Sequence, residues 1–133
     1  MKIESQKIKI QASAERTYAI CSNCNDFAAA LPGQVSDWKS TENECSFTVP
    51  GIAQVRLNIV EKTEFSKIRF QAKADKPVEM ELSVYINALE PNCETFIVID
   101  ADIPVMFSMM VKTPLQNFAN QLIEKIKIKA EEA

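Results

Sequence analysis

The chain has 133 residues, of which 47% are hydrophobic and 25% are charged, and its formal net charge is −3. The length suits one globular domain over residues 1–133, and the mild acidity gives no electrostatic reason to expect a nucleic-acid partner. No stretch approaches the roughly 18 consecutive apolar residues of a membrane span, and the N-terminus lacks the apolar core of a signal peptide. We therefore expect a cytoplasmic protein.

The first quarter of the chain predicts one strand and two short helices. Residues 2–12 alternate polar and apolar side chains as a half-buried strand does, but Ile3 has the opposite parity to the later isoleucines. That mismatch predicts a frayed or bulged start. Ser13 suits the N-cap of a short helix over 14–22, and a second short helix is predicted over 26–31, where a Pro-Gly pair stops it.

From Val35 onward the pattern changes to short strands separated by turn residues. We predict strands over the ranges 35–40, 44–49, 53–61, 66–74, 78–88 and 93–101. Residues that face one another in a hairpin lie on the same face of the sheet, so parity tests each connection. A three-residue turn after Val49 pairs that residue with Ala53 and keeps parity, whereas a two-residue turn breaks it.

Three further hairpins place one apolar face in register across four strands. The loops that give this result cover residues 62–65, 75–77 and 89–92. The pairs that they predict include Leu57 with Phe70, Phe70 with Leu82, and Leu82 with Ile99. The opposite face is polar, except that Tyr85 faces Phe96 with Val98 nearby. Exposed apolar surface often marks an interface, so these three residues are our candidate contact for a homodimer; cross-strand stabilisation is the simpler alternative.

The end of the chain predicts a long amphipathic helix over residues 113–130. Its apolar side chains recur every three or four residues on one stripe, at Leu115, Phe118, Ala119, Leu122, Ile123 and Ile126. Thr113 suits the N-cap, Pro114 the first helical position, and Gln116 completes a capping box. The apolar segment before it, 102–112, carries three methionines and predicts a short helical or irregular lid over one end of the sheet.

The four cysteines offer a sharper interpretation that we weigh and set aside. Cys21 and Cys24 form a C-x-x-C pair, while Cys45 and Cys93 stand alone. A zinc site needs four Cys or His ligands, and the chain contains no histidine. A thioredoxin-like motif would follow a strand, whereas this pair lies at a predicted helix end. We favour free thiols in a reducing compartment and expect neither a metal nor a cofactor.

The order of these elements resembles the START-like superfamily, also called the SRPBCC or birch-pollen-allergen group. The stretch KIKIQASAERTYAICSNCNDFAAALPG looks like the opening of that family, and PLQNFANQLIEKI looks like its closing helix. The segment FAAALPG is similar to the members of this superfamily that are associated with carbon monoxide dehydrogenase. The resemblance implies an α+β helix-grip fold, in which a curved antiparallel sheet of about seven strands wraps round the C-terminal helix. It also implies a cavity between sheet and helix.

Combined with the predicted inner face, the resemblance gives a set of candidate ligand-binding residues. These cavity-lining candidates are Phe47, Leu57, Phe70, Met80, Leu82, Ile97, Met106, Met110 and Phe118. All are apolar, and acid–base chemistry would need titratable groups there. A hydroxyl on Tyr18 is better explained as core, and Asp100 and Asp102 alternate onto the outer face. We find no catalytic constellation.

Three functions follow, in order of preference. The first is non-catalytic binding of a small lipid-like or aromatic ligand in the cavity. The second is protein interaction or assembly through the outer face of the sheet, as the resemblance to carbon monoxide dehydrogenase-associated members suggests. The third is a polyketide cyclase-like enzyme, which we rank last because the chain offers so few acid–base groups. Fold alone does not decide among them.

Overall fold

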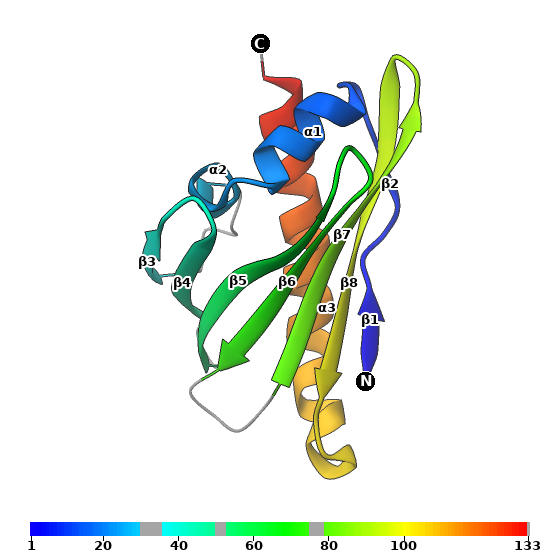
Figure 1. Ribbon diagram of the computed structural model, residues 1–133. Coiled ribbons are helices and arrows are strands. Elements are labelled where there is room, and N and C mark those ends of the chain that lie inside the picture. Colours follow the sequence, from blue (N-terminus) through cyan, green and yellow to red (C-terminus); the bar gives the residue numbers. More distant parts are fainter. Residues whose placement is uncertain (30–35, 50–52, 75–78, 133) are drawn as a thin grey trace.

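The computed structural model describes residues 1–29, 36–49, 53–74 and 79–132. Within these ranges the chain forms one eight-stranded antiparallel sheet, two short helices and a long C-terminal helix (Figure 1). The strand order is β1-β8-β7-β6-β5-β4-β3, and β2 also pairs with β8. This arrangement is the predicted helix-grip α+β fold.

The strands differ greatly in length, and the longest lie in the middle of the sheet. Their bounds are β1 Lys2–Glu4, β2 Ile8–Ile10, β3 Ser36–Ser40, β4 Glu44–Val49, β5 Ala53–Thr63, β6 Lys67–Ala74, β7 Glu79–Leu89 and β8 Asn92–Asp102. The helices are α1 Ala14–Cys21, α2 Cys24–Ala29 and α3 Val105–Glu131. Ser13 caps α1, since its side chain accepts a hydrogen bond from the Arg16 N–H.

The irregular start predicted for the chain is confirmed. β1 and β2 both pair with β8, and the chain breaks its alternation between them. Ser5 lies at the break, where its N–H donates to the Ile97 carbonyl oxygen at 2.8 Å and its hydroxyl oxygen accepts from the Ile97 N–H at 2.8 Å. Because the break changes parity, Ile3 and Ile10 are both buried on the inner face.

Most of the predicted registers are confirmed. Val49 lies opposite Ala53, Phe70 opposite Leu82, and Leu82 opposite Ile99. The β5–β6 register is wrong by two residues, because Leu57 lies opposite Ala72 rather than Phe70. A bulge between Ile59 and Glu61 shifts this pairing, and β5 runs two residues further into the hairpin than predicted, whereas β6 begins one residue later.

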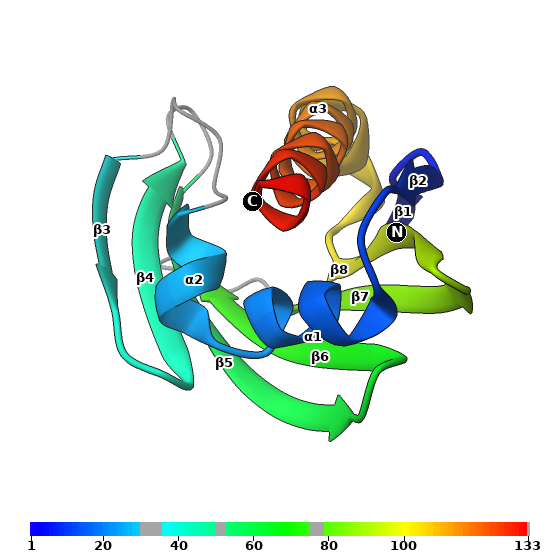
Figure 2. The same cartoon turned by 90° about the horizontal axis from the view of Figure 1, so that it is seen from above.

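The sheet curves around α3, which lies on its concave side (Figure 2). The helix packs against β1, β2, β8 and α1. α1 and α2 cover one end of the concave face, with α1 against β6 and β7 and α2 against β3 and β4. Arg16 on α1 fastens the end of α3, since Nε donates to the Ala130 carbonyl oxygen and Nη2 to that of Glu132, both at 2.6 Å.

The predicted start of the last helix is wrong. Pro114 lies inside α3 rather than at its first turn, and the helix begins at Val105, after Pro104. Residues 105–112 therefore continue the helix past the end of the sheet and do not form a lid over it (Figure 1). A proline inside a helix removes one backbone hydrogen bond, whereas each further helical residue adds one. Residues 105–112 contain no glycine or proline that would stop the helix before Pro114.

Candidate functional site

A small apolar cavity of about 40 Å³ lies between the inner face of the sheet and the middle of α3. Neighbouring strands bring alternate residues to this face, and α3 closes the space from the other side with one stripe. The lining residues come from five strands and from α3. They are Phe47, Val55, Leu57, Ala72, Met80, Glu81, Leu82, Ile99, Leu115 and Phe118.

The structure brings together part of the predicted set. Phe47, Leu57, Met80, Leu82 and Phe118 all line the cavity. Phe70 and Ile97 do not line it, although both are fully buried in the core.

Two of the predicted lining residues, Met106 and Met110, are exposed and do not line the cavity. Met106 and Met110 are 77% and 72% exposed on the part of α3 that extends beyond the sheet. The sequence pattern assigns them to the cavity only if residues 102–112 fold over the sheet. These residues instead continue α3 and stay exposed, so the structure does not place them in the cavity.

Sequence reasoning missed several lining residues that its own rule identified as inward-facing. Val55, Ala72 and Ile99 belong to the confirmed inner face, and Leu115 belongs to the helix stripe. The signal was present in the parity and in the helical spacing. The sequence pattern does not give the position at which α3 crosses the sheet. That position decides which inward-facing residues line the cavity and which pack against another side chain.

The cavity is nearly devoid of polar groups. Glu81 is exposed and on the opposite face of β7, and its carboxylate accepts a hydrogen bond from Arg69 Nη1 at 2.9 Å. The buried polar side chains in the described ranges are Ser5, Thr17, Ser83 and Thr95, and none of them lines the cavity. A molecule in this space would meet hydrocarbon and aromatic surface.

One wall of the cavity is formed by a pair of aromatic rings. Phe118 on α3 stacks over Phe47 on β4, with ring centroids 6.2 Å apart and planes inclined by 14°. Phe118 is only half-buried, so this wall reaches the surface of the protein. Met80, which also lines the cavity, has three rotatable side-chain bonds and a polarisable sulfur. The lining thus includes one ring that reaches the surface and one side chain of adaptable shape.

The volume limits what the cavity holds in this conformation. A space of about 40 Å³ is large enough for a water molecule, whereas sites for drug-sized ligands span about 300–1,000 Å³. A lipid-like molecule would therefore need displacement of side chains that line the cavity.

The titratable side chains of the described residues form no metal-binding cluster. No group of three or more His, Cys, Asp or Glu side chains is placed there to hold a metal ion. Tyr18 is half-buried and packs edge-on against Phe65, with centroids 5.6 Å apart. Asp100 and Asp102 are exposed on the outer side, in agreement with their predicted alternation.

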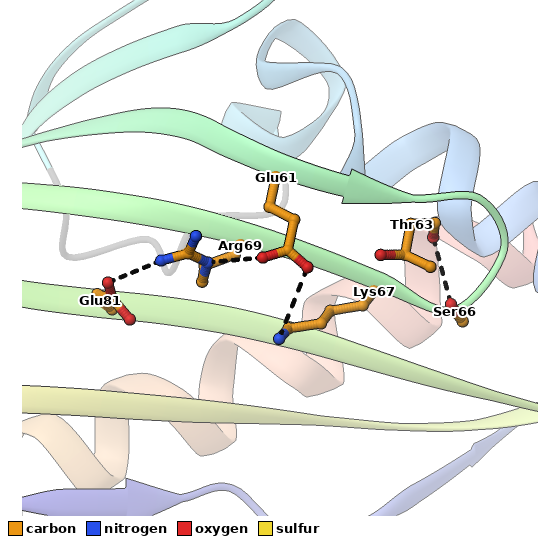
Figure 3. A network of polar contacts seen from close by, with 6 residues as sticks. All are labelled: Glu61, Thr63, Ser66, Lys67, Arg69 and Glu81. Atoms are coloured by element: carbon orange, nitrogen blue, oxygen red, sulfur yellow. Dashed lines mark hydrogen bonds and ion pairs between the residues drawn. The ribbon is translucent and has the colours of Figure 1, made fainter.

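The outer face of the sheet carries a charged network beside the predicted dimer residues. The Glu61 carboxylate pairs with Arg69 at 3.0 Å and with Lys67 at 3.9 Å, and Arg69 reaches Glu81 (Figure 3). Tyr85 and Phe96 stack across the strands at 5.0 Å, as the predicted register requires.

Lysine side chains already cover this aromatic pair. Lys7 Nζ lies 5.4 Å from the centre of the Phe96 ring, and Lys67 Nζ lies 5.3 Å from that of Tyr85. Cation–π contacts of this kind stabilise a ring on a solvated face. More exposed apolar surface lies at the start of α3, on Val105, Met106, Phe107, Met109 and Met110.

Solved structures share this fold over almost the whole chain. A protein from Arthrobacter aurescens matches with a TM-score of 0.78 at 13% identity, over 99% of this chain and 87% of that one. A conserved protein from Geobacillus kaustophilus matches with a TM-score of 0.76 at 8% identity, over 98% of this chain and 95% of that one. Truncated norcoclaurine synthase from Thalictrum flavum matches with a TM-score of 0.70 at 13% identity, over 100% of this chain and 94% of that one.

These likenesses establish a fold of the birch-pollen-allergen type, which norcoclaurine synthase also has. No family model matches the sequence, and neither does any curated protein. Among the helices of the described ranges, none is both long and apolar enough to cross a bilayer.

Proposed function

We propose that this chain is a START-like protein that binds a small apolar ligand, lipid-like or aromatic, in the cavity between its sheet and α3. The observation that carries the proposal is the lining, in which apolar side chains of β4 to β8 face Leu115 and Phe118 across an unfilled space. A largely apolar concave site is the usual form of a small-molecule site. We place this activity in the cytoplasm, as expected from the sequence.

Ligand entry would work through the two adaptable walls. Phe118 is half-buried, so rotation of its ring away from Phe47 exposes the cavity without unfolding α3. Met80 would then rearrange to fit the ligand, since methionine adapts its shape at low cost. The few polar groups near the site leave nothing to orient a charged metabolite, so apolar molecules are the expected class.

The absence of a reaction is part of the proposal. Norcoclaurine synthase is an enzyme by name, and one of its solved forms is a point mutant with a transition-state analogue. In this chain Glu81 is the one titratable residue among those that line the cavity in the described ranges, and its carboxylate is engaged by Arg69 on the outer face. A cyclase-like activity therefore remains the third choice.

The test is a panel of fatty acids, sterols and aromatic compounds, read as shifts in melting temperature. Binding to the folded state alone raises stability by about 2.7 kcal/mol when the ligand is at a hundredfold excess over its Kd. Met80→Trp should abolish the shift by filling the cavity, whereas Met109→Trp, the same change at an exposed site, should preserve it. Met80→Ala should favour larger ligands, because it enlarges the space.

Circular dichroism of each variant checks that it is folded. A panel without any stabilising compound would refute ligand binding. A shift that survives in folded Met80→Trp protein would place the ligand elsewhere.

A second candidate function is assembly, and a specific observation favours it. Val105 and Met109, at the start of α3, are 87% and 86% exposed, and apolar surface of this kind is common at protein contacts. A homodimer through Tyr85, Phe96 and Val98 stays a prediction beside it. Sedimentation of the Met109→Glu and Phe96→Glu variants separates these surfaces, and a wild-type protein that is monomeric at high concentration contradicts self-association through either.

A further inference from the structure

The four cysteines form two buried pairs that divide the C-x-x-C motif. Cys21, at the end of α1, follows by one turn Thr17, which contacts Cys93 on β8, while Cys24, at the start of α2, lies against Cys45 on β4. All four thiols are free, and all are buried. Cys21 and Cys24, which are close in sequence, therefore belong to different pairs, because α1 and α2 direct them to different strands.

The Cys24–Cys45 pair is held by a local network. The Cys24 N–H donates to the Glu42 carbonyl oxygen at 2.7 Å, and the Ser40 hydroxyl donates to Asn25 Oδ1 at 2.7 Å. These bonds dock the first turn of α2 on the β3–β4 hairpin, three residues before Cys45. α2 packs on β4, and there the buried Cys45 thiol comes within hydrogen-bonding reach of the buried Cys24 sulfur.

The hydrogen bond makes the two thiols unequal. It lowers the pKa of Cys24 against the effect of burial, and the Lys62 ammonium favours the thiolate further. The same bond, together with burial, raises the pKa of Cys45. Cys24 is thus the thiol of this pair that ionises more readily, and the thiolate is the nucleophilic form of cysteine.

The second pair has the opposite character, which makes it a matched control. Burial, with Cys93 as a smaller influence, raises the pKa of Cys21 to about 12. The Cys93 sulfur lies 3.4 Å from Thr17 Oγ1 and 3.7 Å from Thr95 Oγ1, within a hydrogen-bonded cluster. Both pairs are buried, but among these four thiols Cys24 alone combines a lowered pKa with a second thiol in contact.

We propose that Cys24 and Cys45 are a dithiol modification site, which a small hydroperoxide such as hydrogen peroxide oxidises to a disulfide between α2 and β4. The Cys24 thiolate attacks one peroxide oxygen, the O–O bond breaks, and the departing hydroxide takes up the proton that Cys24 had released. This gives a sulfenic acid on Cys24 and one water. The Cys45 sulfur then attacks the Cys24 sulfur, the S–O bond breaks, and the hydroxide leaves as a second water with the Cys45 proton.

In the overall reaction, two thiols and one hydrogen peroxide molecule give one disulfide and two water molecules. Two electrons pass from the sulfurs to the peroxide. The oxidant must be small, because Cys24 and Cys45 are 0% and 1% exposed. Phe47 lies two residues beyond Cys45 on the same face of β4, so the disulfide would attach α2 to the strand that carries one wall of the cavity.

The experiment treats the purified full chain with hydrogen peroxide, unfolds it, alkylates the remaining thiols and maps tryptic peptides by mass. We expect residues 17–39 joined to residues 40–56, with the loss of two hydrogen atoms and reversal by dithiothreitol. Cys21 and Cys24 share the first of these peptides, so the Cys21→Ser variant, which should still cross-link, identifies the partner. The oxidised protein should also melt at a higher temperature than the reduced one.

Two variants probe the order of the steps. Cys45→Ser should leave a sulfenic acid on Cys24 that dimedone traps, whereas Cys24→Ser should leave Cys45 unmodified. Oxidation of exposed Met106, in a third peptide, confirms that the peroxide was active. The proposal is overturned if Met106 is oxidised while Cys24 and Cys45 remain open to alkylation, or if the cross-link joins Cys21 to Cys24 or to Cys93.

Discussion

The two ends of the space between the sheet and α3 are packed very differently. At the end covered by α1 and α2, Phe27 stacks on Phe70 with centroids 4.8 Å apart, and both rings are fully buried. At the other end Phe118 lies 6.2 Å from Phe47, and the cavity of about 40 Å³ remains beside them. A curved sheet and one helix leave more space than their side chains fill, and the short helices fill only one end of it.

The largest effect should come from removing a ring at the packed end. Phe70→Ala should destabilise the protein by about 3–5 kcal/mol, because it leaves a void among fully buried neighbours. Met80→Ala, beside the existing cavity, should cost about 2 kcal/mol or less, since part of its surface already lacks contacts. Urea unfolding measures both. Equal losses would mean that the two ends are packed alike in solution.

The row of buried apolar side chains on α3, between the two ends, predicts the next largest loss of stability. Leu122 is fully buried, so Leu122→Ala should cost about 2–5 kcal/mol. Lys125 is exposed on the same helix, and Lys125→Ala should change stability by less than about 0.5 kcal/mol. Thermal denaturation of the two variants under one buffer condition gives the comparison. Similar melting temperatures would contradict the helix orientation described above.

Where α3 leaves the sheet, Pro114 offers a test of the helix start. Pro114→Ala restores an N–H for the Met110 carbonyl oxygen and should stabilise the protein by about 1–2 kcal/mol, after allowance for the freer unfolded chain. Urea unfolding measures the gain, and Thr113→Ala serves as a neighbouring control. A loss of stability in Pro114→Ala would show that the helix begins at Pro114, as the capping pattern predicts.

The smallest effect concerns the far end of α3, at the packed end of the molecule. Glu131 accepts hydrogen bonds from Lys127 and from the Gln11 N–H, and these lower the pKa of its carboxyl. A lowered folded-state pKa contributes stability above the unfolded pKa, and that contribution is lost as the pH falls through the folded value. Glu131→Gln should therefore melt slightly lower than wild type at neutral pH and equally in acid. A pH series of melting temperatures would reject this if the gap were constant.

The β5–β6 hairpin shows where pattern reasoning fails. Parity correctly placed Leu57 and Ala72 on the inner face, because a shift of two residues leaves every side chain on its own face. The tight turn, in which the Ser66 N–H donates to the Thr63 carbonyl oxygen at 3.0 Å, and the bulge before Glu61 set the register instead. Neither has a distinct mark in hydrophobic periodicity.

The candidate site was predictable to a similar extent. Inward parity found Phe47, Leu57, Met80 and Leu82, and the helical stripe found Phe118. It could not separate these from Phe70, which has the same parity but lies under the part of the fold that α1 and α2 fill. Alternation reports which face a side chain occupies, and it carries no information about what stands opposite.

The sequence by itself determined the elements, their order and their apolar faces, because helical and strand periodicity are local properties of the chain. Only the tertiary structure decided that α3 begins at Val105, that Met106 and Met110 stay exposed, and that Cys24 meets Cys45 rather than Cys21. Each of these depends on where one element ends against another. That position is the result of competing packing, capping and bulge energies of a few kcal/mol, which no single segment contains.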